Sequence, residues 1–202
     1  MAMRKILLLV FIIFCNVSFS QSKAEHLVNI TSSKFTLYGT TNLNEYTCEL
    51  IVPDSTGSIA VRTKANDYEL RFTGLEMDYR INDFDCGLEA MSEDLKKTLK
   101  SKEFPYLTLR INKIKIKNEP QEIEKLSVTS EVTIILAGKS KNISIRDGYV
   151  VNHSENSVTL TGKQELNMSD FEISPPTKFF GMIVVNDELS VGFEINMAVR
   201  TF

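Results

Sequence analysis

Alternation of apolar and polar residues with a period of two is the feature that most restricts the fold of this 202-residue sequence. It is clearest in residues 188–199. The apolar members of that alternation are Leu189, Val191, Phe193, Ile195, Met197 and Val199. Successive side chains of a strand point to opposite faces, so the pattern predicts a long β-strand with one buried face. Residues 126–136, 158–166 and 33–39 repeat it.

A change of phase interrupts the alternation in residues 107–116. Leu107, Leu109 and Ile111 share one face, whereas Ile114 and Ile116 fall on the other. One extra residue in a strand shifts the phase in this way, so we expect a β-bulge near residues 112–113.

Four shorter strands and one helix complete the expected elements. The strands are expected at 46–52, 58–63, 68–75 and 142–150. The helix is indicated by Leu88, Met91, Leu95 and Leu99, whose spacings of three and four place them on one helical face. Its acidic residues come early and its lysines late, which suits the helix dipole. Phe104–Pro105 marks the exit into the next strand.

Eight or nine strands with one helix, and no linker rich in Pro, Gly or Ser, predict a single all-β domain. Long strands joined by short turns favour a closed antiparallel barrel over a sandwich, because closure leaves no exposed edge. The interior of a barrel of about eight strands is either filled by side chains or just wide enough for one ligand. The long strands favour the roomier form.

The first twenty residues read as a signal peptide. Arg4 and Lys5 precede an apolar run from Ile6 to Phe14, and small residues stand at the cleavage spacing before Gln21. The run is shorter than the roughly 20 residues that cross a bilayer. We therefore expect a signal peptide at 1–20 and a domain at 21–202, located in the periplasm or secreted, with no membrane span after cleavage. A lipid anchor on Cys15 is disfavoured by the bulky residue before it.

Cleavage leaves two cysteines, Cys48 and Cys86. Free thiols are uncommon outside the cytoplasm, so a disulfide is favoured over two separately buried thiols. The bridge would close a loop of about 40 residues and stabilise the fold by about 3–4 kcal/mol.

Sequence motifs give little support for catalysis, metal binding or nucleic-acid binding. The charged residues are scattered and the net charge is −3, so there is no basic stripe for phosphates. His26 and His153 are far apart, and neither has a second metal ligand at helical spacing. Residues 137–140 (Ala-Gly-Lys-Ser) end like a phosphate-binding loop but lack its first glycine, so a hairpin turn is expected. We predict no catalytic residue, no metal and no enzyme activity.

Residues 169–181 form an unusual apolar segment. Pro175 and Pro176 stiffen it, and it carries four large apolar side chains. These side chains are Phe171, Ile173, Phe179 and Phe180. Exposing all four would be costly, so they either plug one end of the barrel or line an opening.

Several segments, taken in order, resemble the YceI-like family of exported lipid-binding barrels over nearly all of the chain after the signal peptide. Residues 36–39 (Thr-Leu-Tyr-Gly) resemble the family's opening strand. Residues 91–95 and 104–109 resemble its helix and the strand entry that follows. Residues 132–141 resemble its Gly-containing hairpin, and 169–171 (Ser-Asp-Phe) its Arg-Ser-Asp-Phe-Gly stretch. Met168 stands in place of that arginine and Glu172 in place of the glycine.

This resemblance implies a single extended antiparallel eight-stranded lipocalin-like barrel with one short helix, holding a polyisoprenoid or a similar chain. We expect a binding or carrier protein for a polyisoprenoid, an isoprenoid quinone or another lipid, with no other cofactor. The expected inward-facing residues are Phe35, Leu37, Leu109, Val132, Ile134, Leu160, Val191, Phe193 and Ile195. Phe171, Phe179 and Phe180 are expected to guard the mouth.

Two alternatives remain open at this point. A filled barrel could act as an envelope stress or interaction module without a ligand, and solid core is the simplest reading of each inward residue. An enzyme would need convergent polar groups inside the barrel, of which the sequence offers few, Gln164 among them. The sequence does not identify the ligand, and it does not distinguish a monomer from a homodimer.

Overall fold

The computed structural model describes residues 25–53, 58–66, 69–117, 125–154 and 156–201. The predicted signal peptide lies outside them. The described strands are β1 (Glu25–Thr41), β2 (Glu45–Val52), β3 (Ser58–Asn66), β4 (Glu69–Thr73), β5 (Glu76–Arg80), β6 (Tyr106–Ile116), β7 (Lys125–Leu136), β8 (Lys139–Ser154), β9 (Ser157–Asn167), β10 (Thr177–Lys178) and β11 (Ile183–Thr201). The helical elements are η1 (Ile81–Asp83), α2 (Glu89–Thr98) and η2 (Met168–Phe171).

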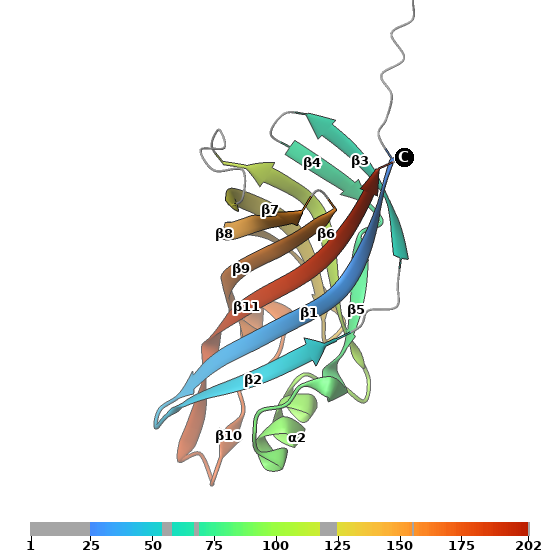
Figure 1. The fold of residues 1–202 in the computed structure, drawn as a ribbon. Coiled ribbons are helices and arrows are strands. Elements are labelled where there is room, and N and C mark those ends of the chain that lie inside the picture. Colours follow the sequence, from blue (N-terminus) through green and yellow to red (C-terminus); the bar gives the residue numbers. More distant parts are fainter. Residues whose placement is uncertain (1–24, 54–57, 67–68, 118–124, 155, 202) are drawn as a thin grey trace, which may run out of the picture.

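Long antiparallel strands wind around a common axis (Figure 1). Hydrogen-bonded neighbours follow the order β11–β9–β8–β7–β6–β4–β3–β1, and β1 pairs again with β11. Each pairing is antiparallel. The fold is therefore the expected all-β, lipocalin-like barrel with one α-helix.

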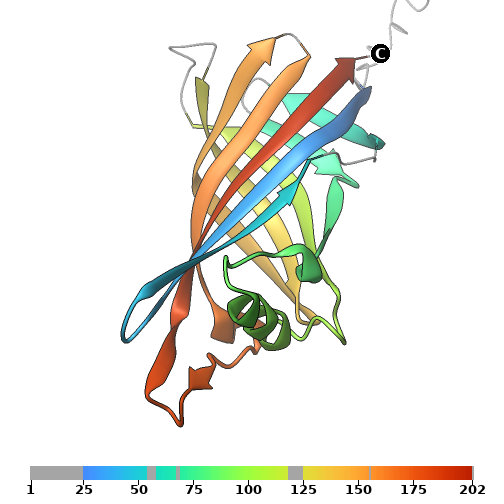
Figure 2. The ribbon, with the colours of Figure 1, turned by 60° about the horizontal axis from the view of Figure 1, so that its bottom comes forward.

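One seam runs down the lower half of this barrel. There β2 pairs with β1 and β5 pairs with β6, but no ladder joins β2 to β5 in the described part of the chain. Residues 81–88 lie at the seam, where Glu49 and Asp85 form an isolated β-bridge. Helix α2 follows and lies across the lower end of the barrel (Figure 2).

Most of the expected elements are present. The register of β6 shifts between Ile111 and Lys113, which confirms the predicted bulge. Helix α2 begins at Glu89 and ends at Thr98, within the predicted segment. The turn at residues 137–138 joins β7 to β8, so it is a hairpin turn and not a phosphate-binding loop.

Two expected strands were bounded wrongly. The strand expected at 68–75 is two strands, because Gly74 has a positive φ (86°) and turns the chain between β4 and β5. The strand expected at 142–150 is the longer β8, since it pairs with β7 on one edge and with β9 on the other.

Alternation along the strands builds the core as expected. In β1, Phe35 and Leu37 are buried while Lys34 and Tyr38 are exposed. Several large side chains lie at the centre of the core with almost no exposed surface. They are Leu50, Leu75, Ile81, Ile111, Leu160, Phe171 and Ile195.

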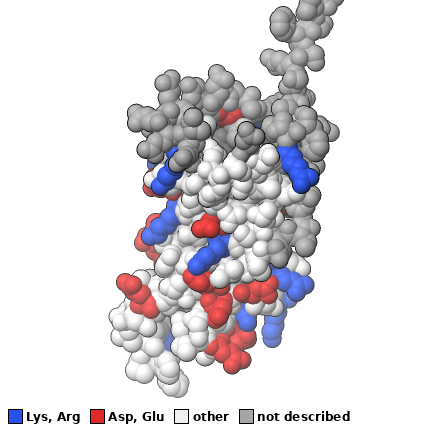
Figure 3. Space-filling model, viewed as in Figure 1, with Lys and Arg blue, Asp and Glu red and all other residues white. Residues whose placement is uncertain are grey.

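Charged side chains of both signs are interspersed over the face seen in Figure 3. No described helix is long and apolar enough to cross a membrane.

Candidate functional site: an apolar cavity and its mouth

A cavity of about 100 Å³ lies inside the barrel. Side chains from β1, β6, β7, β9 and β11 form its wall, and Met168, Phe171 and Ile173 close it from the segment after β9. Ten of the twelve residues predicted to bind a ligand line this cavity. They are Phe35, Leu37, Leu109, Val132, Ile134, Leu160, Phe171, Val191, Phe193 and Ile195.

The other two predicted residues lie elsewhere. Phe179 lines a second cavity at the lower end of the barrel, and Phe180 is fully exposed. The apolar segment 169–181 therefore serves two roles. Phe171 and Ile173 are buried and plug the barrel, whereas Phe179 and Phe180 point outward from the next turn.

Polar side chains are rare in the central cavity. Ser130 on β7 is 1% exposed, and its hydroxyl has no hydrogen-bond partner among the residues that the structure describes. Gln164 on β9 donates from Nε2 to the backbone oxygen of Glu165 (2.8 Å). None of the described side chains lining this cavity is titratable, so its surface suits a hydrocarbon rather than a charged group.

Gly162 on β9 makes room for one of the cavity's aromatic rings. It pairs across the sheet with Phe193 on β11. A Cβ at position 162 would lie 2.6 Å from Cζ of Phe193. The missing side chain of Gly162 thus allows the Phe193 ring to occupy this part of the wall.

A larger cavity, of about 450 Å³, lies at the lower end of the barrel, between α2, the β1–β2 turn and the start of β11. We call it the mouth. It is lined by Tyr46 and Met91, among others, and it shares Leu99, Met168 and Leu189 with the central cavity. The same three side chains therefore separate the mouth from the barrel interior.

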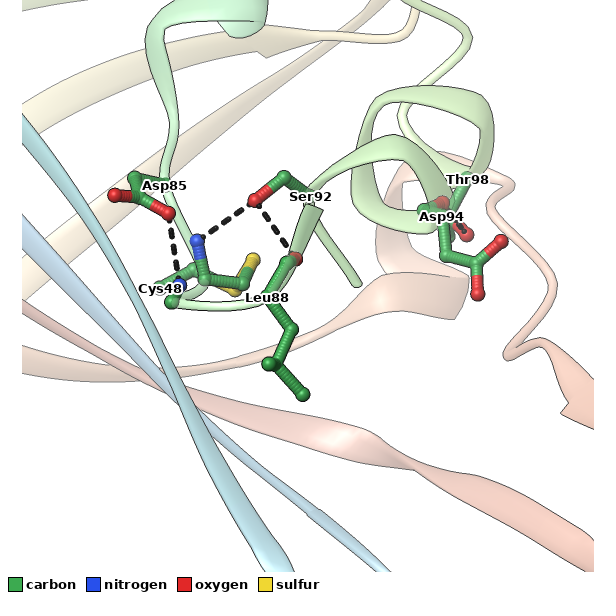
Figure 4. The surroundings of a disulfide bond; sticks show 8 residues. Cys48, Asp85, Leu88, Ser92, Asp94 and Thr98 are labelled. Atoms are coloured by element: carbon green, nitrogen blue, oxygen red, sulfur yellow. Dashed lines mark hydrogen bonds between the residues drawn. A yellow bond between two sulfur atoms is a disulfide. The ribbon is translucent and has the colours of Figure 1, made fainter. Parts of the chain in front are cut away.

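The disulfide holds the edge of the mouth. Cys48 on β2 is bonded to Cys86, which precedes α2, so the predicted bridge is present, and both cysteines line the mouth. Ser92 of α2 supports this corner: its hydroxyl accepts a hydrogen bond from the Cys86 amide (3.0 Å) and donates to the Leu88 carbonyl (Figure 4). The disulfide joins the two sides of the seam.

An ion pair spans the mouth from the other side. Lys178 on β10 lies 2.7 Å from the carboxylate of Asp94 on α2, and both residues line the mouth. Burial raises the pKa of Tyr46, which also lines the mouth, so this phenol is neutral at pH 7.

A third apolar cavity, of about 250 Å³, lies at the opposite end of the barrel. Ile114, Val128 and Met197 line it. These residues stand two or three positions along their strands from Ile111, Ser130 and Ile195 of the central cavity. Separate apolar cavities therefore lie at both ends of the barrel and at its centre.

A ring of antiparallel strands around an apolar interior, with a helix across one end, defines a lipocalin-like barrel. The chain belongs to the YceI-like family, whose domain model matches residues 16–197. No curated protein sequence matches the chain significantly.

Solved structures that share this fold include two that cover most of the chain. One is a polyisoprenoid-binding domain from Saccharophagus degradans implicated in plant cell wall breakdown. It superposes with a TM-score of 0.60 at 11% identity, over 87% of this chain and 98% of that one. The other is BcnA from Burkholderia cenocepacia, with a TM-score of 0.52 at 14% identity, over 81% and 95% of the two chains.

Sequence reasoning missed several residues of the site. In the sequence Met168 stands out only as a departure from the family pattern, yet its side chain contributes to both cavities. Leu99 and Leu189 belong to the helical and strand patterns but were not assigned to a site. The periodicity predicts that these two side chains are buried, but it does not show that the helix and β11 meet at one end of the barrel.

Proposed function

We propose that this protein binds the hydrocarbon chain of a polyisoprenoid, an isoprenoid quinone or another lipid inside its barrel, and acts as a carrier rather than an enzyme. The observation that supports this proposal most is that the central cavity and the mouth adjoin, because Leu99, Met168 and Leu189 belong to the walls of both. The shared fold with a polyisoprenoid-binding domain supports this proposal.

The binding energy would come from desolvation of the ligand. Burial of apolar surface contributes about 25 cal/mol per Å². The central cavity of about 100 Å³ is smaller than the roughly 150 Å³ that holds one benzene, so a chain entering it must displace side chains. The mouth is larger and would hold the rest of the ligand. Its polar residues, Asn44 and Thr41 among them, would face a head group.

The proposed location is the periplasm or the extracellular space. Disulfides such as Cys48–Cys86 are typical of oxidising compartments and rare in the cytosol, which agrees with the signal peptide expected at residues 1–20.

Native mass spectrometry of protein purified from its source envelope, followed by organic extraction, tests the proposal. We expect an apolar chain released in a 1:1 ratio. Farnesol added to the empty protein should raise its Tm, because a ligand that binds only the folded state stabilises it by mass action.

A pair of matched variants locates the binding site. Val191→Phe adds a ring to the cavity wall and should reduce the shift in Tm caused by farnesol. Ile51→Phe makes the same kind of change at an exposed position on β2 and should leave the shift unchanged. Equal shifts in both variants would place the ligand outside the barrel.

A filled barrel that acts as an interaction module is the second candidate. The small volume of the central cavity favours it, as do the exposed apolar residues at the lower end. An empty protein that neither binds farnesol nor gains thermal stability from it would establish this alternative.

A further inference from the structure

Four large apolar side chains are exposed together at the lower end of the molecule. They come from two turns: Leu43 from the β1–β2 turn, and Phe179, Phe180 and Met182 from the β10–β11 turn. Their exposed fractions are 69%, 66%, 108% and 68%. We call these four residues the apolar tip.

Hydrogen bonds join the two turns into one unit. The side chain of Asn42 donates to the Met182 carbonyl (2.9 Å) and accepts from the Val184 amide (2.9 Å). The Asn42 amide donates to the Val184 carbonyl (3.0 Å). The tip is therefore a defined surface built by residues about 140 positions apart in the sequence.

The backbone of the tip is costly. Phe179 and Phe180 have φ values of 51° and 56°, in the left-handed region that glycine adopts more easily. Neither ring recovers this cost by burial within the chain, because both are mostly exposed. The turn between β10 and β11 requires this geometry, since the Gly181 amide donates to the Lys178 carbonyl across the two phenylalanines, and the turn holds both rings away from the core.

The tip carries no charge. Residues 179–186 contain no Lys, Arg, Asp or Glu, and the adjacent Lys178 is paired with Asp94. In Figure 3 the end of the molecule at which β1–β2 and β10–β11 turn is almost entirely white. A neutral apolar partner fits this surface better than a charged one does.

The size of the tip argues against a stable dimer. An aromatic side chain has a surface of about 150–250 Å² and an aliphatic one has less, and three of the four are only about two thirds exposed, so the four together present on the order of 500 Å². A stable protein interface buries about 800 Å² on each partner. The tip projects from two narrow turns, a shape suited to insertion between lipid head groups.

We propose that the apolar tip inserts into the surface of a lipid bilayer and sets the mouth against it. This inference rests on the proposed function, because a lipid surface is the source from which an apolar chain would enter the barrel. Phe179 belongs to the tip and also lines the mouth, so the inserted surface is continuous with the entrance. A ligand would pass from lipid to barrel without crossing water.

Flotation with vesicles of phosphatidylcholine tests the tip directly. The variant Phe180→Ser/Met182→Ser should partition onto vesicles at least about tenfold less than the wild type, since it removes two inserted side chains. Ile51→Ser removes an exposed apolar side chain from β2, away from the tip, and should leave partitioning unchanged. Unchanged circular dichroism spectra and Tm establish that both variants are folded.

Binding of farnesol delivered on cyclodextrin tests the carrier function without a membrane, and so independently of the tip. We expect the tip variant to bind it like the wild type while floating poorly. Wild-type protein that binds farnesol but not vesicles would overturn the tip proposal alone. Protein that binds vesicles but not farnesol would support the tip and remove the carrier function. Self-association that is lost in the tip variant, without vesicle binding, would show a second copy as the partner and overturn the proposal.

Discussion

At the scale of single residues, a buried hydroxyl pair connects β1 to β5. Ser33 and Tyr79 are hydrogen-bonded at 3.0 Å, and the phenol also donates to the sulfur of Met77 (3.3 Å). Tyr79→Phe would leave the buried Ser33 hydroxyl without this partner, which costs about 1–2 kcal/mol. Urea unfolding should show that loss. The same change at the partly exposed Tyr106 should cost little.

The same phenol makes stability sensitive to alkaline pH. Burial raises the pKa of Tyr79, against a smaller lowering by Ser33, and burial also raises that of Tyr46. An unfolded tyrosine releases its proton near pH 10, while the folded one still holds it. Stability present below about pH 10 is therefore lost as the pH rises from that value toward the raised folded pKa. Tm measured from pH 8 to 11 should fall less steeply in Tyr79→Phe.

A substitution of Ser130 is expected to leave stability unchanged or to raise it, unlike the substitution of Tyr79. Its hydroxyl is buried without a partner in the cavity wall, so Ser130→Ala removes a desolvation cost and breaks no hydrogen bond of the described chain. We expect unchanged or slightly raised stability in urea and tighter binding of a pure hydrocarbon. A loss of more than about 1 kcal/mol would instead show that a buried water satisfies the hydroxyl.

At the scale of elements, the disulfide secures a part of the wall that lacks a hydrogen-bonded ladder. Cys48 and Cys86 are 38 positions apart and join β2 to the segment before α2. The double variant Cys48→Ser/Cys86→Ser should be less stable by about 3–4 kcal/mol. Reductant should lower the Tm of the wild type and leave that of the double variant unchanged. A double variant as stable as the wild type would mean that the β-bridge between Glu49 and Asp85 suffices to hold the seam.

Local periodicity explains which elements could be predicted. The β6 bulge, the helix at 89–98 and the turn at 137–138 depend on residues close in sequence, so pattern alone located them. The split between β4 and β5 depends on one glycine conformation and on which part of β6 each strand meets. At the seam, the described strands β2 and β5 do not pair. The sequence pattern of a strand does not show which neighbour it pairs with, so the seam could not be predicted.

At the scale of the whole molecule, the interior was predictable and the mouth was not. Alternation reports which side chains face inward, and the ring of strands brings those side chains to one cavity. The mouth is made where α2, η2 and two turns meet, and contacts such as Lys178 with Asp94 join segments far apart in the sequence. Such contacts follow from the overall topology, which periodicity does not encode. The apolar segment 169–181 predicts Phe180 at the mouth, but its ring lines none of the described cavities.

We expect the ion pair across the mouth to slow the entry and exit of a ligand, because it links β10 to α2 over the cavity. Lys178→Met removes the link between β10 and α2, and an exposed pair of this kind contributes about 0.2–1 kcal/mol. The exchange of bound farnesol should therefore be up to about fivefold faster in this variant. High salt should speed the exchange of farnesol from the wild type but not from the variant, because salt screens the ion pair. Lys113→Met is the control. It removes the ion pair between Lys113 on β6 and Glu131 on β7, and farnesol should exchange from it as fast as from the wild type. Equal acceleration in both variants would show that ligands pass through another part of the wall.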